Sequence, residues 1–442
     1  MNRVAAIAIF GVAACASSLP RTAAEPGAGE GGSAERELEE IVDQGDRPVR
    51  IALATAATSP RIGGTESWRL YNRTSSDIVV RGSASEVVRV ENRNGELVVI
   101  RANGTPTGGN RGPFIVRATS PGSFLTYEGK RYRGEIRITP AATGLLVVNR
   151  LGIESYLRGV VPLEIGNRVA GEEAAVEAQA VAARSYSYIK LAANSAREFD
   201  MYSSVQDQVY GGADAEKPMA DAAVGATRKM VLLYGGKVVN TPYSSTCGGS
   251  TSAVEEVWWR EPPQPHLRPV SDRVPGTDKF YCDASPRFRW TAAFEKANLR
   301  ETLEKYLGQY SSGAEPTVAP NPSSPRVSIG SVRSVRVDGR TPSDRVSTLT
   351  VQTARGNYVL RGNDIRFVLR GPTGTILNST SFTAESATDS TGEVSRLTLT
   401  GGGFGHGIGM CQWGAIGRAR AGQDYRTILT TYYQGTTVGT ID

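Results

Sequence analysis

The sequence predicts an α+β protein in which a β-rich N-terminal portion leads into a mixed core of strands with a few packed helices. Its 50 glycines and 23 prolines, against 39% hydrophobic residues, favour strands and turns over a helical bundle. Short alternating apolar runs separated by turn residues begin at Val49. One long segment, 172–193, lacks glycine and proline and is rich in alanine, which predicts a helix.

The remaining elements follow in chain order. We expect a β-rich N-terminal part at 46–140 and a core at 141–442 that carries a variable insertion around 260–395. Within the core, the pattern predicts helices near 215–227 and 291–306. Gly235 and Gly236 separate two apolar runs, which is typical of a hairpin turn.

The first residues indicate export. Arg3 precedes an apolar run that is too short to span a bilayer, so 1–14 is predicted to be a signal peptide. The run ends in VAAC, which is similar to a bacterial lipobox, and we therefore expect Cys15 to become a lipidated anchor. The alternative is that Cys15 is an ordinary residue of the apolar region and that cleavage follows Ala24. Residues 15–45 are expected to form a disordered tether.

The net charge of +6 and the pI near 9.1 suit an anionic partner. An anionic polymer of the cell envelope and nucleic acid both meet that description. The sequence has no basic helix, no zinc-finger spacing and no basic stripe with interleaved aromatic residues. We therefore expect no nucleic-acid partner.

Glu164 is the first candidate for chemistry. Pro162 fixes the backbone just before it, and apolar Leu163 and Ile165 flank it. Such a partly dehydrated setting raises the pKa of a glutamate toward neutrality, so the group would hold and donate a proton at pH 7. In the helix predicted next, Gln179 and Arg184 are polar residues in a small-residue run and are expected to face a cleft. The alternative makes Glu164 a loop carboxylate and the other two solvated helix positions.

The second candidate is LTLTGGGFGHGIGMCQWGAIGRARAG at 397–422, a glycine-rich segment around His406. It lacks both G-x-G-x-x-G and the Lys-Ser/Thr ending of a phosphate-binding loop. Its glycines would allow close approach of the backbone to a bulky ligand such as a sugar. His406, Gln412 and Trp413 would then supply polar contacts and a stacking face. The alternative is a packing motif in which His406 is a satisfied core histidine.

These segments resemble one known family. YLRGVVPLEI followed by EAQAVAARSYSY, the Q.YGG element, the YSSTCGGST loop, GFGHGIGMCQWGA and the YYQG ending are similar to the signatures of the stage II sporulation protein D and amidase-enhancer family. Many relatives have a histidine where this sequence has Ser244, and this departure weakens the expectation of a metal site that uses that histidine.

The resemblance implies that Glu164 is a catalytic acid and base. It predicts a peptidoglycan lytic transglycosylase, since only one carboxylate stands in a convincing setting whereas ordinary glycosidases need two. The expected partners are glycan strands and a cell-wall amidase, and no cofactor is expected. The alternative is a non-catalytic wall-binding protein that activates an N-acetylmuramoyl-L-alanine amidase. The residues expected to line the glycan groove are Gln179, Arg184, Tyr243, Ser245, Thr246, His406, Gln412 and Trp413.

The cysteines leave the redox chemistry open. If Cys15 is lipidated, three remain, and a Cys247–Cys282 disulfide would join two segments beside the predicted cleft and leave Cys411 free. Three packed thiols are the alternative. Zinc bound by the three cysteines and His406 is a rival, although the spacing is not a recognised zinc pattern.

Overall fold

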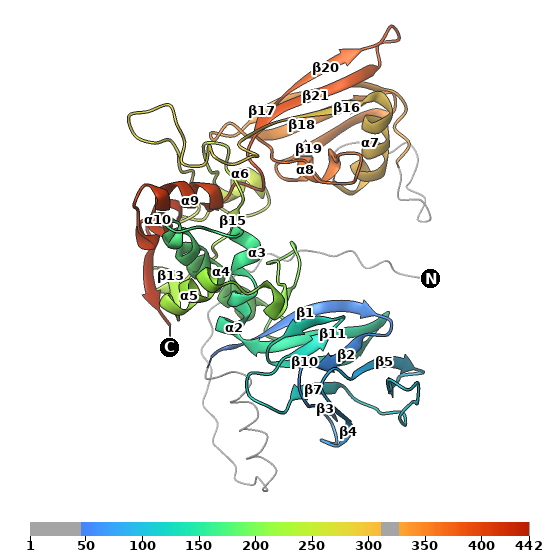
Figure 1. Cartoon of the computed structure of the whole chain (residues 1–442). Coiled ribbons are helices and arrows are strands. Elements are labelled where there is room, and N and C mark those ends of the chain that lie inside the picture. The colour runs from blue at the N-terminus through green and yellow to red at the C-terminus, as the bar shows by residue number, and fades with distance from the viewer. Residues whose placement is uncertain (1–45, 311–326, 442) are drawn as a thin grey trace, which may run out of the picture.

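The computed structural model describes residues 46–310 and 327–441, and it confirms the α+β class. Figure 1 shows a β-rich N-terminal body, a group of helices at the centre and a second β-rich body formed by the later part of the chain. The signal peptide, Cys15 and the tether that the sequence predicts all lie outside the described residues. Within the described residues, no helix is both long and apolar enough to cross a membrane.

Two sheets form the N-terminal body, and their strand pairs are antiparallel except for β12, which pairs in parallel with β1. Alternate residues of their strands, such as Trp68 and Leu70, are buried, as the period of a half-buried strand requires. Side chains from both sheets, including Ile62 and Val147, share one hydrophobic cluster, so the sheets pack face to face. The seven-stranded sheet has the order β12-β1-β11-β10-β7-β3-β4, and the other has the order β6-β5-β2-β8-β9. The strands are β1 (Pro48–Ala57), β2 (Arg61–Gly64), β3 (Trp68–Asn72), β4 (Ile78–Gly82), β5 (Val87–Arg93), β6 (Glu96–Ile100), β7 (Phe114–Ala118), β8 (Leu125–Tyr127), β9 (Lys130–Tyr132), β10 (Glu135–Ala141), β11 (Gly144–Gly152) and β12 (Met201–Tyr202).

The central helices surround α4 (Glu173–Ala193), which begins one residue after the predicted start at 172. Because its residues are small, neighbouring elements approach it from several sides, and a helix covered in this way is buried rather than amphipathic. The other elements of this region are α2 (Ile153–Arg158), α3 (Val161–Ile165), η1 (Gly212–Ala215), α5 (Pro218–Ala226), β13 (Met230–Tyr234), β14 (Lys237–Val238), β15 (Tyr243–Ser244), α6 (Val254–Val257), β22 (Met410–Cys411), α9 (Gln412–Arg420), α10 (Tyr425–Tyr432) and β23 (Thr437–Thr440).

The hairpin predicted at Gly235 and Gly236 is present between β13 and β14. Both glycines have positive φ, 56° and 76°, which a two-residue hairpin turn of this hand requires. The last strand, β23, pairs with β13, so the end of the described chain lies against the middle of the sequence.

The later β-rich body has its own hydrophobic cluster, to which Phe294, Leu349 and Leu399 belong. Its two three-stranded sheets have the orders β16-β21-β20 and β17-β18-β19. The elements are β16 (Arg289–Glu295), α7 (Lys296–Tyr310), β17 (Val332–Arg340), β18 (Val346–Thr353), β19 (Gly356–Arg361), α8 (Asp364–Val368), β20 (Phe382–Thr388) and β21 (Val394–Gly402).

One predicted helix is partly wrong. The sequence predicts a helix near 291–306, but residues 289–295 form strand β16 and the helix, α7, starts at Lys296. Trp290 and Phe294 alternate with exposed residues and face the cluster, because β16 pairs along its full length with β21, more than a hundred residues later. This pairing outweighs the local helical pattern.

Candidate active site

Glu164 lies in α3, a helix of five residues that follows directly from strand β11 through α2. Pro162 occupies the first turn of α3, where its missing N–H costs nothing, and Gly166 ends the helix with a φ of 76°. Ile165 is buried, but Leu163 is 45% exposed. The expectation that both neighbours dehydrate Glu164 is therefore wrong for Leu163, and the burial of the carboxyl comes from other segments.

The surroundings of Glu164 favour a proton on its carboxyl group. Burial raises its pKa to about 7, and this effect outweighs two hydrogen bonds that favour the ionised form. One is donated by the Val209 backbone N–H to Oε1 at 2.7 Å. The other comes from the side chain of Gln412. At neutral pH the group is therefore divided between an acid that can donate a proton and a base that can accept one.

The loop at 203–212 closes one side of Glu164. Besides Val209 it supplies Gln208, whose Oε1 accepts a hydrogen bond from the Tyr243 hydroxyl at 2.7 Å and whose Nε2 donates to Ser187 Oγ at 3.0 Å. Burial, followed by the nearby charge of Glu164, raises the pKa of Tyr243 well above its usual value. The Q.YGG pattern pointed to this loop, but it did not assign contacts to Gln208 and Val209.

Gln179 and Gln412 lie together behind the carboxyl group of Glu164. The Gln412 side chain donates to Gln179 Oε1 at 3.1 Å, and Gln179 is 0% exposed. One amide hydrogen of Gln412 is thus bonded to Gln179 on α4, and the same side chain also forms a hydrogen bond with Glu164. Gln179 was expected to face the cleft, but its burial makes it a support for Gln412 instead.

Arg184 does not face a cleft. It is 0% exposed, and its guanidinium donates two parallel hydrogen bonds to Glu154, at 2.8 and 2.7 Å. A further bond reaches the Met230 carbonyl at 3.0 Å. With these donors occupied in the interior, Arg184 joins α4 to α2 and cannot contact a glycan in this conformation, which corrects the sequence expectation.

The glycine-rich motif joins the loop after β15. Strand β15 pairs in parallel with β22, and Thr246 pairs with Phe404. Gly405 has a φ of 115°, and a Cβ there would lie 2.6 Å from that of Ser244, so only glycine permits this approach. Thr246 is 1% exposed and is thus buried by the pairing. The glycines bring two chain segments together, whereas the sequence analysis expected them to approach a ligand.

His406 is held as a neutral imidazole. Its Nδ1 accepts the Ile408 N–H at 3.0 Å, and the ring also donates to the Tyr243 carbonyl. Burial, aided by the charges of Arg366 and Arg345, lowers its pKa to about 3. Its ring packs at 5.2 Å from that of Trp258. Because both nitrogens are engaged within the chain, this geometry matches the satisfied core histidine of the alternative interpretation.

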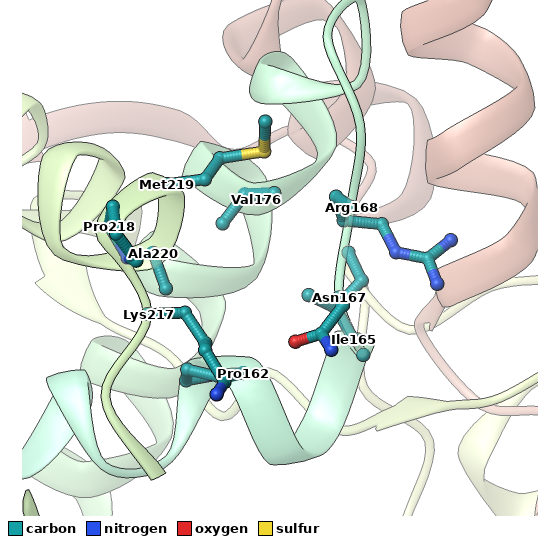
Figure 2. Close-up of a pocket in the computed structure, with 10 residues that line it drawn as sticks. Pro162, Ile165, Asn167, Arg168, Val176, Lys217, Pro218, Met219 and Ala220 are labelled. Atoms are coloured by element: carbon teal, nitrogen blue, oxygen red, sulfur yellow. The ribbon is translucent and has the colours of Figure 1, made fainter.

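A pocket of about 310 Å³ opens beside α3 (Figure 2). Residues 217–220 line one side of it, Asn167 and Arg168 line another, and Val176 contributes from α4. The Arg168 guanidinium lies 5.6 Å from the centre of the half-buried Trp413 ring. The backbone N–H of Trp413 donates a hydrogen bond to the Ser245 carbonyl. Glu164 is not among the lining residues, although Pro162 and Ile165 of the same helix are, so the pocket does not contain the carboxyl group.

The three cysteines of the described chain come together behind the site as free thiols. Cys247 Sγ lies 3.5 Å from Cys282 Sγ, and Cys411 joins them. The disulfide stays a prediction. The fourth ligand-type residue of this group is Asp272, and His406, the partner that the sequence suggested for zinc, does not belong to it.

Comparison with known proteins supplies the family. A family model described as "Stage II sporulation protein" matches residues 141–234, which include Glu164 and α4. The amidase enhancer of Bacillus subtilis is 30% identical over 72% of this chain, and stage II sporulation protein D of the same organism is 29% identical over 67%. The chain belongs to the stage II sporulation protein D and amidase-enhancer family.

The matches also show how much of this chain and of each relative is similar. An uncharacterized protein of Brachyspira hyodysenteriae is 29% identical over 88% of this chain and 91% of its own length. The match spans 76% of the B. subtilis sporulation protein but only 45% of the amidase enhancer, so more than half of that relative has no counterpart here. A domain of unknown function (DUF8618) matches 271–409, a range that includes the later β-rich body from β16 to β21.

Proposed function

We propose that the protein is a cell-wall protein of the envelope that cleaves peptidoglycan glycan strands as a lytic transglycosylase. One observation carries the proposal: Glu164 is a carboxyl group whose pKa is raised to about 7, in the helix α3 that also lines a pocket. Asp207 lies in the same network, but both its oxygens accept hydrogen bonds and it pairs with Lys190 at 2.8 Å. It therefore serves poorly as the second carboxylate of a hydrolase.

The proposed reaction needs one carboxyl group. Glu164 donates its proton to the glycosidic oxygen as the bond between that oxygen and the muramyl C1 breaks. The 6-hydroxyl oxygen of the same muramyl residue attacks C1, and its proton passes to the Glu164 carboxylate. The product is a 1,6-anhydromuramyl end, and no water is consumed. Mass spectrometry of glycan strands incubated with the protein tests this proposal.

The pocket beside α3 supports an anionic strand as the ligand. Lys217 is exposed at its rim, and Arg168 lines it near Trp413. A muramyl residue that has lost its stem peptide carries a free carboxylate, which such cations attract. This chemistry fits glycan strands stripped of stem peptides, the substrate that the family resemblance implies.

A second function is supported by one relative. The amidase enhancer of B. subtilis is named for its effect on an amidase. The same groove would then bind the wall without chemistry, and the protein would activate an N-acetylmuramoyl-L-alanine amidase. Glu164 would be structural in that case, so its substitution separates the two functions.

The pKa of Glu164 predicts how the reaction depends on pH. Because the free protein must hold a proton on Glu164, kcat/KM should be constant in weak acid and fall about tenfold per pH unit above about 7. Substitution Gln412→Met removes a hydrogen bond that favours the carboxylate, so the midpoint should move to higher pH. Rates of product formation across this range measure both midpoints. A wild-type midpoint near 4.5, the ordinary value for glutamate, would contradict the assignment.

Lipidation at Cys15 is proposed from the sequence, and it predicts a location. Globomycin, which blocks the peptidase that cleaves lipoprotein precursors, should leave a larger precursor that keeps residues 1–14. The substitution Cys15→Ser should leave unlipidated protein that no longer partitions with membranes as the wild type does. Fractionation and intact-mass analysis measure this. If Cys15→Ser is processed and partitions as the wild type does, the proposal of a lipid anchor at Cys15 is wrong and only the prediction of export stands.

A further inference from the structure

Four ligand-type side chains from three separate segments converge behind the glycine-rich motif. Cys247 follows β15, Asp272 and Cys282 lie in the crossing that leads to β16, and Cys411 ends β22. The three sulfurs and one Asp272 oxygen all lie within 4.8 Å of one another, and all four residues are buried. Four such groups around one point are the number that a structural zinc site uses.

The spacing fits a tetrahedral ion. Zn–S bonds of about 2.3 Å place two sulfurs of a tetrahedron about 3.8 Å apart, whereas a disulfide joins them at about 2.05 Å. Cys247 Sγ lies 3.5 Å from Cys282 Sγ and 3.3 Å from Asp272 Oδ2. The group is too tight to enclose a multinuclear iron–sulfur cluster, so a single ion is the species that fits.

Two backbone N–H groups point at the sulfur of Cys411. Its sulfur accepts the N–H of Cys247 at 3.1 Å and that of Gly414 at 3.3 Å. Cys411 also caps the N-terminus of α9, where the helix dipole stabilises negative charge. In a protein with a Cys247–Cys282 disulfide, Cys411 would keep these two hydrogen bonds and remain as a single buried thiol.

Asp272 is oriented in the way that a metal-binding carboxylate requires. Its Oδ1 accepts the Tyr432 hydroxyl at 2.5 Å and the Arg418 guanidinium at 3.1 Å. Its Oδ2 is therefore directed at the sulfurs, where it meets Cys247. Hydrogen bonds that hold the non-ligating atom of a ligand are typical of metal sites.

The surrounding charges balance a divalent ion. Three thiolates and one carboxylate carry four negative charges, of which a divalent cation neutralises two. Arg418 and the buried Arg345, which donates to the Cys247 carbonyl at 3.0 Å, offset the other two. With neutral thiols instead, Asp272 would carry the only negative charge of this group, and it is already paired with Arg418.

We propose that Cys247, Asp272, Cys282 and Cys411 bind one zinc ion. The ion is structural, because four protein ligands close its coordination sphere. It fastens the loop after β15 and the crossing to the start of α9. Since Gln412 follows Cys411 directly and contacts Glu164, the ion also fixes the helix from which that contact comes. Only the link from the ion through Gln412 to Glu164 rests on the proposed function.

Metal content and spectra test the site without any activity assay. Protein purified without chelator should contain one zinc per chain, and the thiols of Cys247, Cys282 and Cys411 should react only after denaturation in the presence of a chelator. Cobalt substituted for zinc should give the charge-transfer and d–d absorption of a tetrahedral thiolate site. Substitutions Cys282→Ser and Asp272→Asn should each lower bound zinc below one per chain. Tyr433→Phe, which removes a buried hydroxyl bonded to the Pro242 carbonyl, is the matched control and should retain zinc.

Three results would overturn the site. Peptide mapping without reductant that finds Cys247 joined to Cys282 would establish the disulfide, and reduced wild-type protein that takes up neither zinc nor cobalt would leave three packed thiols. If Asp272→Asn binds zinc with unchanged affinity, Asp272 is not a ligand and the four-ligand site is wrong. The cobalt spectrum of the wild type keeps the test decisive if a variant fails to fold. Loss of glycan cleavage with zinc intact would count against the proposed function only.

Discussion

Substitution Glu164→Gln is expected to abolish formation of anhydromuramyl product while strand binding persists. Glutamine keeps the shape of the side chain and its bond to the Val209 N–H, but it has no acidic proton to donate. General acid–base catalysis is worth about 10²–10⁴-fold, so the rate should fall by at least that range. Product formation by chromatography and strand binding by sedimentation measure the two properties separately.

A second glutamate serves as the control for this result. Glu177 lies on α4, is also partly buried and also has a pKa raised mainly by burial, yet it contacts none of the groups placed around Glu164. Glu177→Gln should leave the rate unchanged. Equal activity of wild type and Glu164→Gln would show that Glu164 is structural.

Substitution Arg184→Ala is expected to lower the free energy of unfolding by about 3–5 kcal/mol, because it leaves Glu154 as an unpaired carboxylate in the interior. The Met230 carbonyl also loses its donor. The substitution Glu154→Gln should be destabilising for the same reason, since it leaves a buried guanidinium. Urea unfolding followed by circular dichroism measures the difference.

An exposed ion pair gives the comparison. Arg61 and Glu128 are bonded at 2.8 Å but are 60% and 40% exposed, so Arg61→Ala should cost at most about 1 kcal/mol. If Arg184→Ala costs no more than Arg61→Ala, the buried pair does not hold α4 to α2 in the way described.

Local patterns predicted the parts of the fold that local chemistry determines. The helix at 172–193 follows from a run without glycine or proline, and the turn at Gly235 follows from two adjacent glycines. The strand at 289–295 did not follow from its sequence, because its pairing with β21 is remote along the chain. A prediction of helix or strand from local sequence fails where pairing with a distant segment determines the structure.

The same distinction holds for the site. The setting of Glu164 after a proline indicated a raised pKa, although the burial comes from distant segments and not from Leu163. Arg184 was expected at a cleft because its partner, Glu154, stands thirty residues earlier and nothing local links them. Asp272 was missed as a neighbour of the cysteines, since no spacing pattern joins it to them.

The most direct test of the central proposal is mass spectrometry of purified glycan strands, with and without stem peptides, after incubation with the protein. We expect stripped strands to yield fragments with 1,6-anhydromuramyl ends, each lighter by one water than the corresponding product of hydrolysis. Strands that remain intact, together with faster cleavage by a cell-wall amidase when wild type or Glu164→Gln is added, would contradict the transglycosylase and establish the activator.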